Sequence, residues 1–276
     1  IKIKNLTIKE FPKPEAVPFN PDKDLTQADR IRIKGYIFSE LGKFSRYPEI
    51  PLGLKTLIDP TEIPSDEMAS FLSEFRNGSD EGSNPQYWRE LGFLKITYPK
   101  AFEGIVHESE SGLDVITENL RTHLNQAFYL FLEGILILQQ TRDQIAKSFL
   151  YNNKNSIRNL IIRDIDSILD ADVDSRPEII PYFLKELALA KIIDPTLLES
   201  DDLNSDFWEK GKKMIQKSRQ EELNPNMLVN TAIYLNILAA EKIKINENGI
   251  ELTKPIPYPV LQSVKTEPIP KVRRFG

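Results

Sequence analysis

Proline placement constrains this chain more than any other feature of its sequence. Ten of the 19 prolines lie before Lys100 and five lie from Pro255 onward, whereas none occurs between Lys100 and Arg176. Proline removes a backbone donor and breaks helix interiors, so long helices can form in the proline-free middle. The sequence therefore predicts a mainly α-helical fold, in which a central helical domain lies between extended, proline-rich ends.

Apolar periodicity supports helices in the middle of the chain. The run "AFYLFLEGILIL", Ala127 to Leu138, is apolar on nearly all sides, so other helices should surround it. Its twelve residues are too few to cross a bilayer, which needs about 20. With Asp114 as its cap, the helix is predicted to run unbroken for over 30 residues, up to a break at 152–155. Further helices are predicted over 156–170 and 177–192.

The two ends combine small β elements with extended arms. The first eleven residues, "IKIKNLTIKEF", alternate as a strand does, and "PKPEAVPFNP" has four prolines in ten positions, which favours an extended chain. A helix capped by Asp24 or Thr26 should follow. We expect five segments: an N-terminal strand and arm (1–24), a small helical and loop region (25–101), the central helical domain (102–200), a helix–helix–hairpin unit (201–254) and a basic arm (255–276).

The hairpin is predicted from alternation near the C-terminus. Four apolar residues alternate there with polar ones: Ile243, Ile245, Ile250 and Leu252. Asn248-Gly249 supplies the turn, because both residues tolerate positive φ. Two helices followed by a hairpin is the order of a winged-helix module. The alternative is a plain hairpin that packs on the helical body and can pair with the N-terminal strand.

Charge is distributed unevenly along the chain. Residues 101–209 hold 9 basic and 20 acidic side chains, whereas residues 210–276 hold 12 basic and 6 acidic. Such asymmetry can mark an interaction surface, or the basic end can dock on the acidic middle. The candidate contacts to a partner or a nucleic acid are Lys210, Lys212, Lys213, Lys217, Arg219, Lys271, Arg273 and Arg274. The second helix of the predicted helix–helix–hairpin unit has no Arg or Lys before Lys242. It is therefore poorly suited to contact bases in a nucleic-acid groove.

Groups that usually carry catalysis are scarce. With no cysteine there is no disulfide, thiolate metal site or cysteine nucleophile. The two histidines, His107 and His123, do not form a paired metal-ligand spacing. Neither a phosphate-binding glycine loop nor a nucleophile elbow occurs. We therefore expect no catalytic residue and no cofactor.

One acidic stretch partly resembles a calcium loop. Three carboxylates stand at positions 1, 3 and 5 of a twelve-residue frame: Asp170, Asp172 and Asp174. Ser175 replaces the glycine of position 6, and Pro181 replaces the bidentate glutamate of position 12. Asp166 and Asp170 share a helix face, but no phosphate-binding motif accompanies them. A solvated acidic turn, with Asp174 or Ser175 capping the next helix, is therefore predicted rather than a metal site.

These observations favour a non-enzymatic structural or adaptor subunit of a larger assembly. Its extended terminal arms would contact a protein partner or a second copy, because such arms gain order by binding. A nucleic-acid-binding protein that uses the basic C-terminal unit is the alternative, and an enzyme with an unconventional site is a third. The absence of cysteine and of a visible secretory signal favours a reducing cytoplasm.

Overall fold

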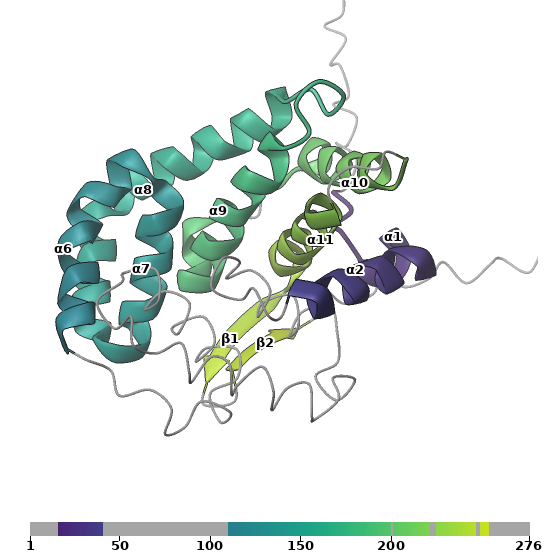
Figure 1. Cartoon of the computed structure of the whole chain (residues 1–276). Helices are drawn as coiled ribbons and strands as arrows, with labels where there is room; N and C mark the ends of the chain where they lie inside the picture. The colour runs from purple at the N-terminus through teal and green to yellow at the C-terminus, as the bar shows by residue number, and fades with distance from the viewer. Residues whose placement is uncertain (1–15, 41–109, 200, 221–224, 247–248, 254–276) are drawn as a thin grey trace, which may run out of the picture.

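Helices dominate the part of the chain that the structure describes. The structure is a computed structural model, and it describes residues 16–40, 110–199, 201–220, 225–246 and 249–253. Within these ranges the only sheet is a two-stranded antiparallel hairpin near the C-terminus (Figure 1). The predicted mainly α-helical fold with a C-terminal hairpin is confirmed. The predicted N-terminal strand and the arm over 255–276 lie outside the described residues.

Helix α9 lies at the centre of this arrangement. It packs against α7 and α8 on one side and α11 on the other, while α6 covers α7, α10 lies against α11 and α8, and α2 lies against α11 (Figure 1). The elements are α1 (Pro21–Asp24), α2 (Gln27–Glu40), α6 (Glu110–Gln126), α7 (Phe128–Thr141), α8 (Asp143–Asp170), α9 (Ile179–Ile193), η5 (Pro195–Leu197), α10 (Ser205–Gln220), α11 (Pro225–Ala239), β1 (Lys242–Asn246) and β2 (Gly249–Thr253). The predicted central domain and C-terminal unit therefore pack directly on each other.

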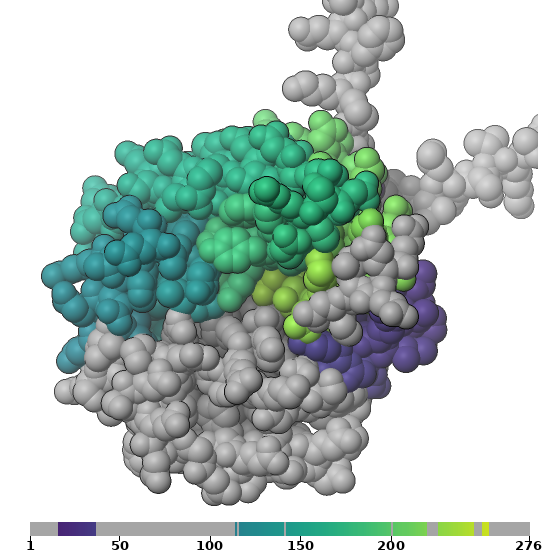
Figure 2. Space-filling view, turned by 45° about the horizontal axis from the view of Figure 1, so that its top comes forward, coloured from purple at the N-terminus to yellow at the C-terminus, as the bar shows by residue number. Residues whose placement is uncertain are grey.

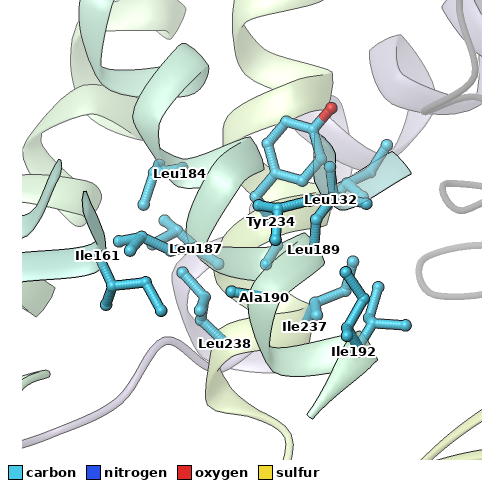
Figure 3. Close-up of a cluster of buried hydrophobic side chains, with 14 of the residues drawn as sticks. Leu132, Ile161, Leu184, Leu187, Leu189, Ala190, Ile192, Tyr234, Ile237 and Leu238 are labelled. Carbon is cyan, nitrogen blue, oxygen red and sulfur yellow. The ribbon is translucent and has the colours of Figure 1, made fainter. Parts of the chain in front are cut away.

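The core is one cluster of buried side chains that extends from Phe19 to Ile250. Figure 3 shows its centre, where leucines of α9 face residues of α11 such as Tyr234 and Leu238. The prediction that the apolar run of α7 is enclosed is confirmed. Four of its side chains are almost fully buried: Phe128, Phe131, Leu132 and Ile135.

The prediction of one long helix before residue 152 is wrong. The chain leaves helical geometry at Ala127 (φ −151°, ψ 87°) and at Arg142 (φ −137°, ψ 58°), so α6, α7 and α8 are separate helices. Asp114 lies inside α6 and its carboxylate is 2.6 Å from Arg142, so it is not the predicted cap. The predicted break at 152–155 is also wrong, because α8 continues through it.

Packing explains these breaks, since no proline lies there. A straight helix over 115–150 would have 36 residues and be about 54 Å long, whereas α8, the longest of the described helices, has 28 residues. Folding back at Ala127 and Arg142 places α7 between α6, α8 and α9, where its apolar side chains are buried. The burial of α7 therefore outweighs the local helix propensity at these two residues.

The end of the predicted N-terminal arm packs on the helical body. Residues 21–24 form α1, so the prediction of an extended arm is wrong there. Residues 16–20 have no regular secondary structure, and among them Phe19 is fully buried. The predicted Thr26 cap is confirmed. Thr26 N–H donates to Asp29 Oδ2 (2.8 Å) and Asp29 N–H donates to Thr26 Oγ1 (3.1 Å), which is a reciprocal capping box.

The hairpin pairs Ile243 with Leu252 and Ile245 with Ile250, so the four alternating apolar residues share one face. Gly249, predicted to lie in the turn, is instead the first residue of β2 and pairs with Asn246. Ile250 is buried and the other three pack against the core, so the apolar face of the hairpin covers the helices. The described part of the hairpin thus packs on the helical body. Asn248 of the predicted turn lies outside the described residues.

We expect Phe131→Ala to lower the free energy of unfolding by about 3–5 kcal/mol, because it removes a fully buried ring and leaves a cavity. Tyr151→Ala is the matched control, since its ring is 83% exposed and its loss should cost about 0.5 kcal/mol or less. Urea unfolding of both variants measures the difference. Equal losses in the two variants would contradict the enclosed position of α7.

Candidate functional site

Two of the predicted contact cations hold the turn that follows α8. The Lys210 ammonium donates to the Ala171 carbonyl (2.6 Å), which is an unsatisfied acceptor at the end of that helix. The Lys217 ammonium lies 3.1 Å from Asp174 in the acidic turn. The basic helix α10 therefore docks on the acidic middle of the chain at these two points.

Two more of these cations hold the N-terminal segment. The Lys212 ammonium donates to the Val17 carbonyl (3.0 Å). Arg219 donates from Nε to Asp29 Oδ2 (2.8 Å) and from Nη2 to the Asp24 carbonyl (2.5 Å), and Asp29 is almost fully buried. These contacts tie α10 to α1 and α2.

Within the described chain, the remaining candidate cations do not form a surface that could contact bases in a nucleic-acid groove. Lys213 is exposed on α10, and the other three, Lys271, Arg273 and Arg274, lie outside the described residues. Every described side chain from Asn226 to Ala240 is buried or half-buried, so α11 offers no exposed face to insert into a groove. Contact between these cations and a partner or a nucleic acid stays a prediction.

The acidic turn is solvated as predicted. Three carboxylates there are exposed: Asp170, Asp172 and Asp174. The Asp174 N–H donates to Asp172 Oδ1 (3.0 Å), and this hydrogen bond lowers the pKa of Asp172. Neither Asp174 nor Ser175 caps α9, whose N-cap is Glu178 without a side-chain bond, so that prediction is wrong.

Metal ligands do not converge in the described residues, where no group of three or more His, Asp or Glu side chains could hold an ion. His123 is half-buried on α6. His107 lies outside the described residues. The described chain thus gives no metal site to which a reaction could be assigned.

A group of ionisable side chains with three buried carboxyls, which the sequence analysis missed, lies where α7, α8 and α9 meet. We call it the junction cluster, and its members are Tyr129, Glu133, Arg163, Asp164, Tyr182, Lys185 and Glu186. Three of its carboxyl groups, on three different helices, are almost fully buried: Glu133, Asp164 and Glu186. Burying charge is costly without compensation, so each carboxyl needs a partner or a proton.

Two of these carboxyls have cations. The Lys185 ammonium lies 2.7 Å from Glu133 Oε1 and 5.0 Å from the centre of the Tyr129 ring. Arg163 donates from Nε (3.1 Å) and Nη2 (2.8 Å) to Asp164 Oδ1. The cluster therefore contains ion pairs between α7 and α9 and within α8.

Glu186 has a different role, because it accepts the Tyr129 backbone N–H at 3.1 Å. That N–H belongs to the first turn of α7, whose N-cap Ala127 has no capping side chain. Burial, with further contributions from the hydrogen bond and charge of Asp164, raises the pKa of Glu186 to about 8. Burial, followed by the charge and hydrogen bond of Glu186, raises the pKa of Tyr182 to about 12. This raised pKa favours the neutral acid form of Glu186, whose Oε1 caps α7.

The sequence carried one usable signal for this cluster. Glu133 and Glu186 each interrupt an apolar helical run, "YLFLEGILIL" and "YFLKELALA". A charged residue at a buried helical position requires a partner, but its identity depends on how helices distant in sequence pack. Tyr182 is 46% exposed, and its ring lies edge-on to Tyr129.

A second polar contact of α9 closes the end of α11. The Lys191 ammonium donates to the carbonyls of Leu238 (2.5 Å) and Ala240 (2.7 Å), which have no helical partners. Burial lowers the pKa of Lys191 to about 8. A lysine held by carbonyl groups in this way completes a helix end, and we assign it no chemistry.

Comparisons with protein-family models, curated proteins and solved structures found no match to this chain. Among the described helices, none is both long enough and apolar enough to span a membrane. Function must therefore be argued from the surface and the polar groups of the chain itself.

We expect Arg219→Ala to lower the free energy of unfolding by about 1–3 kcal/mol, because it leaves the buried Asp29 without its cation. Amide exchange should accelerate in residues 16–30, which Arg219 and Lys212 hold. Lys213→Ala is the matched control on the same helix, and it should change neither quantity. The structural role of Arg219 would be contradicted if the two variants behaved alike.

Proposed function

We propose that this chain is a non-enzymatic subunit that binds another protein, or a second copy of itself, through the outer face of α8. The observation that carries the proposal is the pair Tyr151 and Ile162, which are 83% and 42% exposed. They are eleven residues apart, which is close to three helical turns, so they lie on one line along α8 about 16 Å apart. A single exposed apolar residue is ordinary, whereas two on one helix line suggest a contact surface.

The residues around this pair suit a protein interface. Small, uncharged polar side chains lie next to it, together with two exposed lysines, Lys147 and Lys154: the polar residues are Ser148, Asn152, Asn155 and Asn159. Interface centres are depleted in charge and enriched in aromatic residues. Figure 2, in which the top of Figure 1 comes forward, shows side chains of α8 on the molecular surface. The centre of this face combines apolar anchors with amides that can form hydrogen bonds to a partner backbone.

The other functions find less support in the described residues. An enzyme needs a reactive group open to a substrate, whereas the carboxyls of the junction cluster are buried. Nucleic-acid binding needs exposed cations, whereas Lys210, Lys212, Lys217 and Arg219 bind other parts of the chain. Protein binding through α8 requires no group that the fold already uses.

We expect the double variant Tyr151→Ala, Ile162→Ser to weaken the complex at least tenfold, since interface energy concentrates in a few apolar anchors. The complex is first defined by native mass spectrometry of the tagged chain from its own cells and reconstituted from purified components. Ile31→Ser is the matched control, because Ile31 is 62% exposed on α2, away from this face. Both proteins should unfold at the same temperature as the original chain.

Other outcomes would contradict this proposal. A chain that stays monomeric at high concentration and yields no complex of fixed composition is not an assembly subunit. Equal binding by the double variant and the control would place the interface elsewhere. Retention on heparin with a steep salt dependence would favour the nucleic-acid alternative, because released counterions produce that dependence.

The C-terminal arm is the second element of the proposal. Residues 255–276 contain five prolines, and its end "KVRRFG" is basic. Deleting residues 263–276 should leave the melting temperature unchanged and weaken the same complex, because an arm of this composition contributes little to a core. A lower melting temperature with unchanged binding would show that the arm stabilises the chain itself.

A further inference from the structure

The junction cluster lacks one positive charge. Its three buried carboxyls are accompanied by two cations, Lys185 and Arg163. Lys185 pairs with Glu133, and Arg163 pairs with Asp164. Within the described residues no Lys or Arg forms an ion pair with Glu186. A buried carboxylate without a cation is expected to take up a proton instead of remaining charged.

The unused oxygens indicate where that proton lies. Asp164 Oδ1 accepts both Arg163 bonds, and Glu186 Oε1 accepts the Tyr129 N–H. The second oxygens, Asp164 Oδ2 and Glu186 Oε2, are fully buried, and no donor of good geometry in the described chain reaches them. The two side chains are within hydrogen-bonding contact of each other. Two carboxyl groups can form such a bond only if one of them carries the proton.

We propose that Asp164 and Glu186 share one proton at neutral pH, and that loss of this proton in mildly alkaline solution loosens the contact of α9 with the first turn of α7. The groups that face the pair come from all three helices. They are Arg163 from α8, Tyr129 and Glu133 from α7, and Tyr182 and Lys185 from α9. This inference is independent of the proposed partner surface.

Loss of the shared proton should lower the stability of the folded chain as the pH rises. An unfolded Glu releases its proton near pH 4.5, whereas the folded chain holds the pKa of Glu186 at about 8. The folded state therefore binds more protons between these values, and stability falls as pH rises through this window. Lys191 acts in the opposite direction above pH 8, because its pKa is lowered from 10.5 to about 8. Tyr182 acts only above about pH 10, because its pKa is raised to about 12.

Glu186→Gln tests the shared proton. The amide keeps the shape of the neutral acid, its carbonyl can accept the Tyr129 N–H, and its NH2 can donate to Asp164 Oδ2. In the unaltered chain, the unfolding equilibrium constant should rise by up to tenfold per pH unit between pH 5 and 8, as one proton requires. In Glu186→Gln that rise should disappear. Glu178→Gln, an exposed carboxyl just before α9, is the matched control and should retain it.

If Glu186→Gln does not fold, a direct titration of the unaltered chain still tests the shared proton. The side-chain carboxyl carbon of Glu186 is followed by NMR in the unaltered chain, together with amide exchange at Tyr129. A midpoint near pH 8, with faster Tyr129 exchange above it, supports the shared proton. In Asp164→Asn the new amide donates to the Glu186 carboxylate, so the midpoint should move to lower pH. A Glu186 midpoint below about 5.5 in the unaltered chain, or a Tyr129 exchange rate independent of this titration, would overturn the proposal.

Discussion

Helix α9 completes the ends of two neighbouring helices, and the arrangement of the body depends on these contacts. Glu186 accepts the Tyr129 N–H in the first turn of α7, and Lys191 donates to the last carbonyls of α11. Each end would otherwise have unsatisfied backbone groups in a buried setting, at a cost of about 1–3 kcal/mol per group. The central helix thus fixes its neighbours through backbone hydrogen bonds as well as apolar packing.

The same solution recurs at other helix ends. The Ala171 carbonyl at the end of α8 accepts from Lys210 of α10, and the Ile193 carbonyl at the end of α9 accepts from Gln139 of α7. A third example is Arg219, which donates to the last residue of α1. Because these donors belong to other helices, these particular helix ends are not capped when the helix is isolated. The helices should therefore form together with the packed body instead of independently.

Sequence periodicity identified what each segment could bury, but not where the chain turns. It correctly indicated the enclosed run of α7, the Thr26 cap and the apolar face of the hairpin, because each depends on residues close in sequence. It missed the turns at Ala127 and Arg142, because those are set by the neighbours of α7 and not by a local breaker. The junction cluster was missed for the same reason. Its partners Glu133 and Lys185 are 52 positions apart, and only helix packing brings them together.

The uneven charge of the chain is explained in part by internal docking. Four of the five α10 cations that were predicted as partner contacts, Lys217, Lys210, Lys212 and Arg219, bind Asp174, Ala171, Val17 and Asp29 within the chain. These contacts use the basic segment to hold the acidic turn and the N-terminal helices. Surface charge is therefore a poor guide to a partner site in this body. An apolar pair that the fold leaves open, such as Tyr151 and Ile162 on α8, is a better guide, since burying it removes apolar area from water.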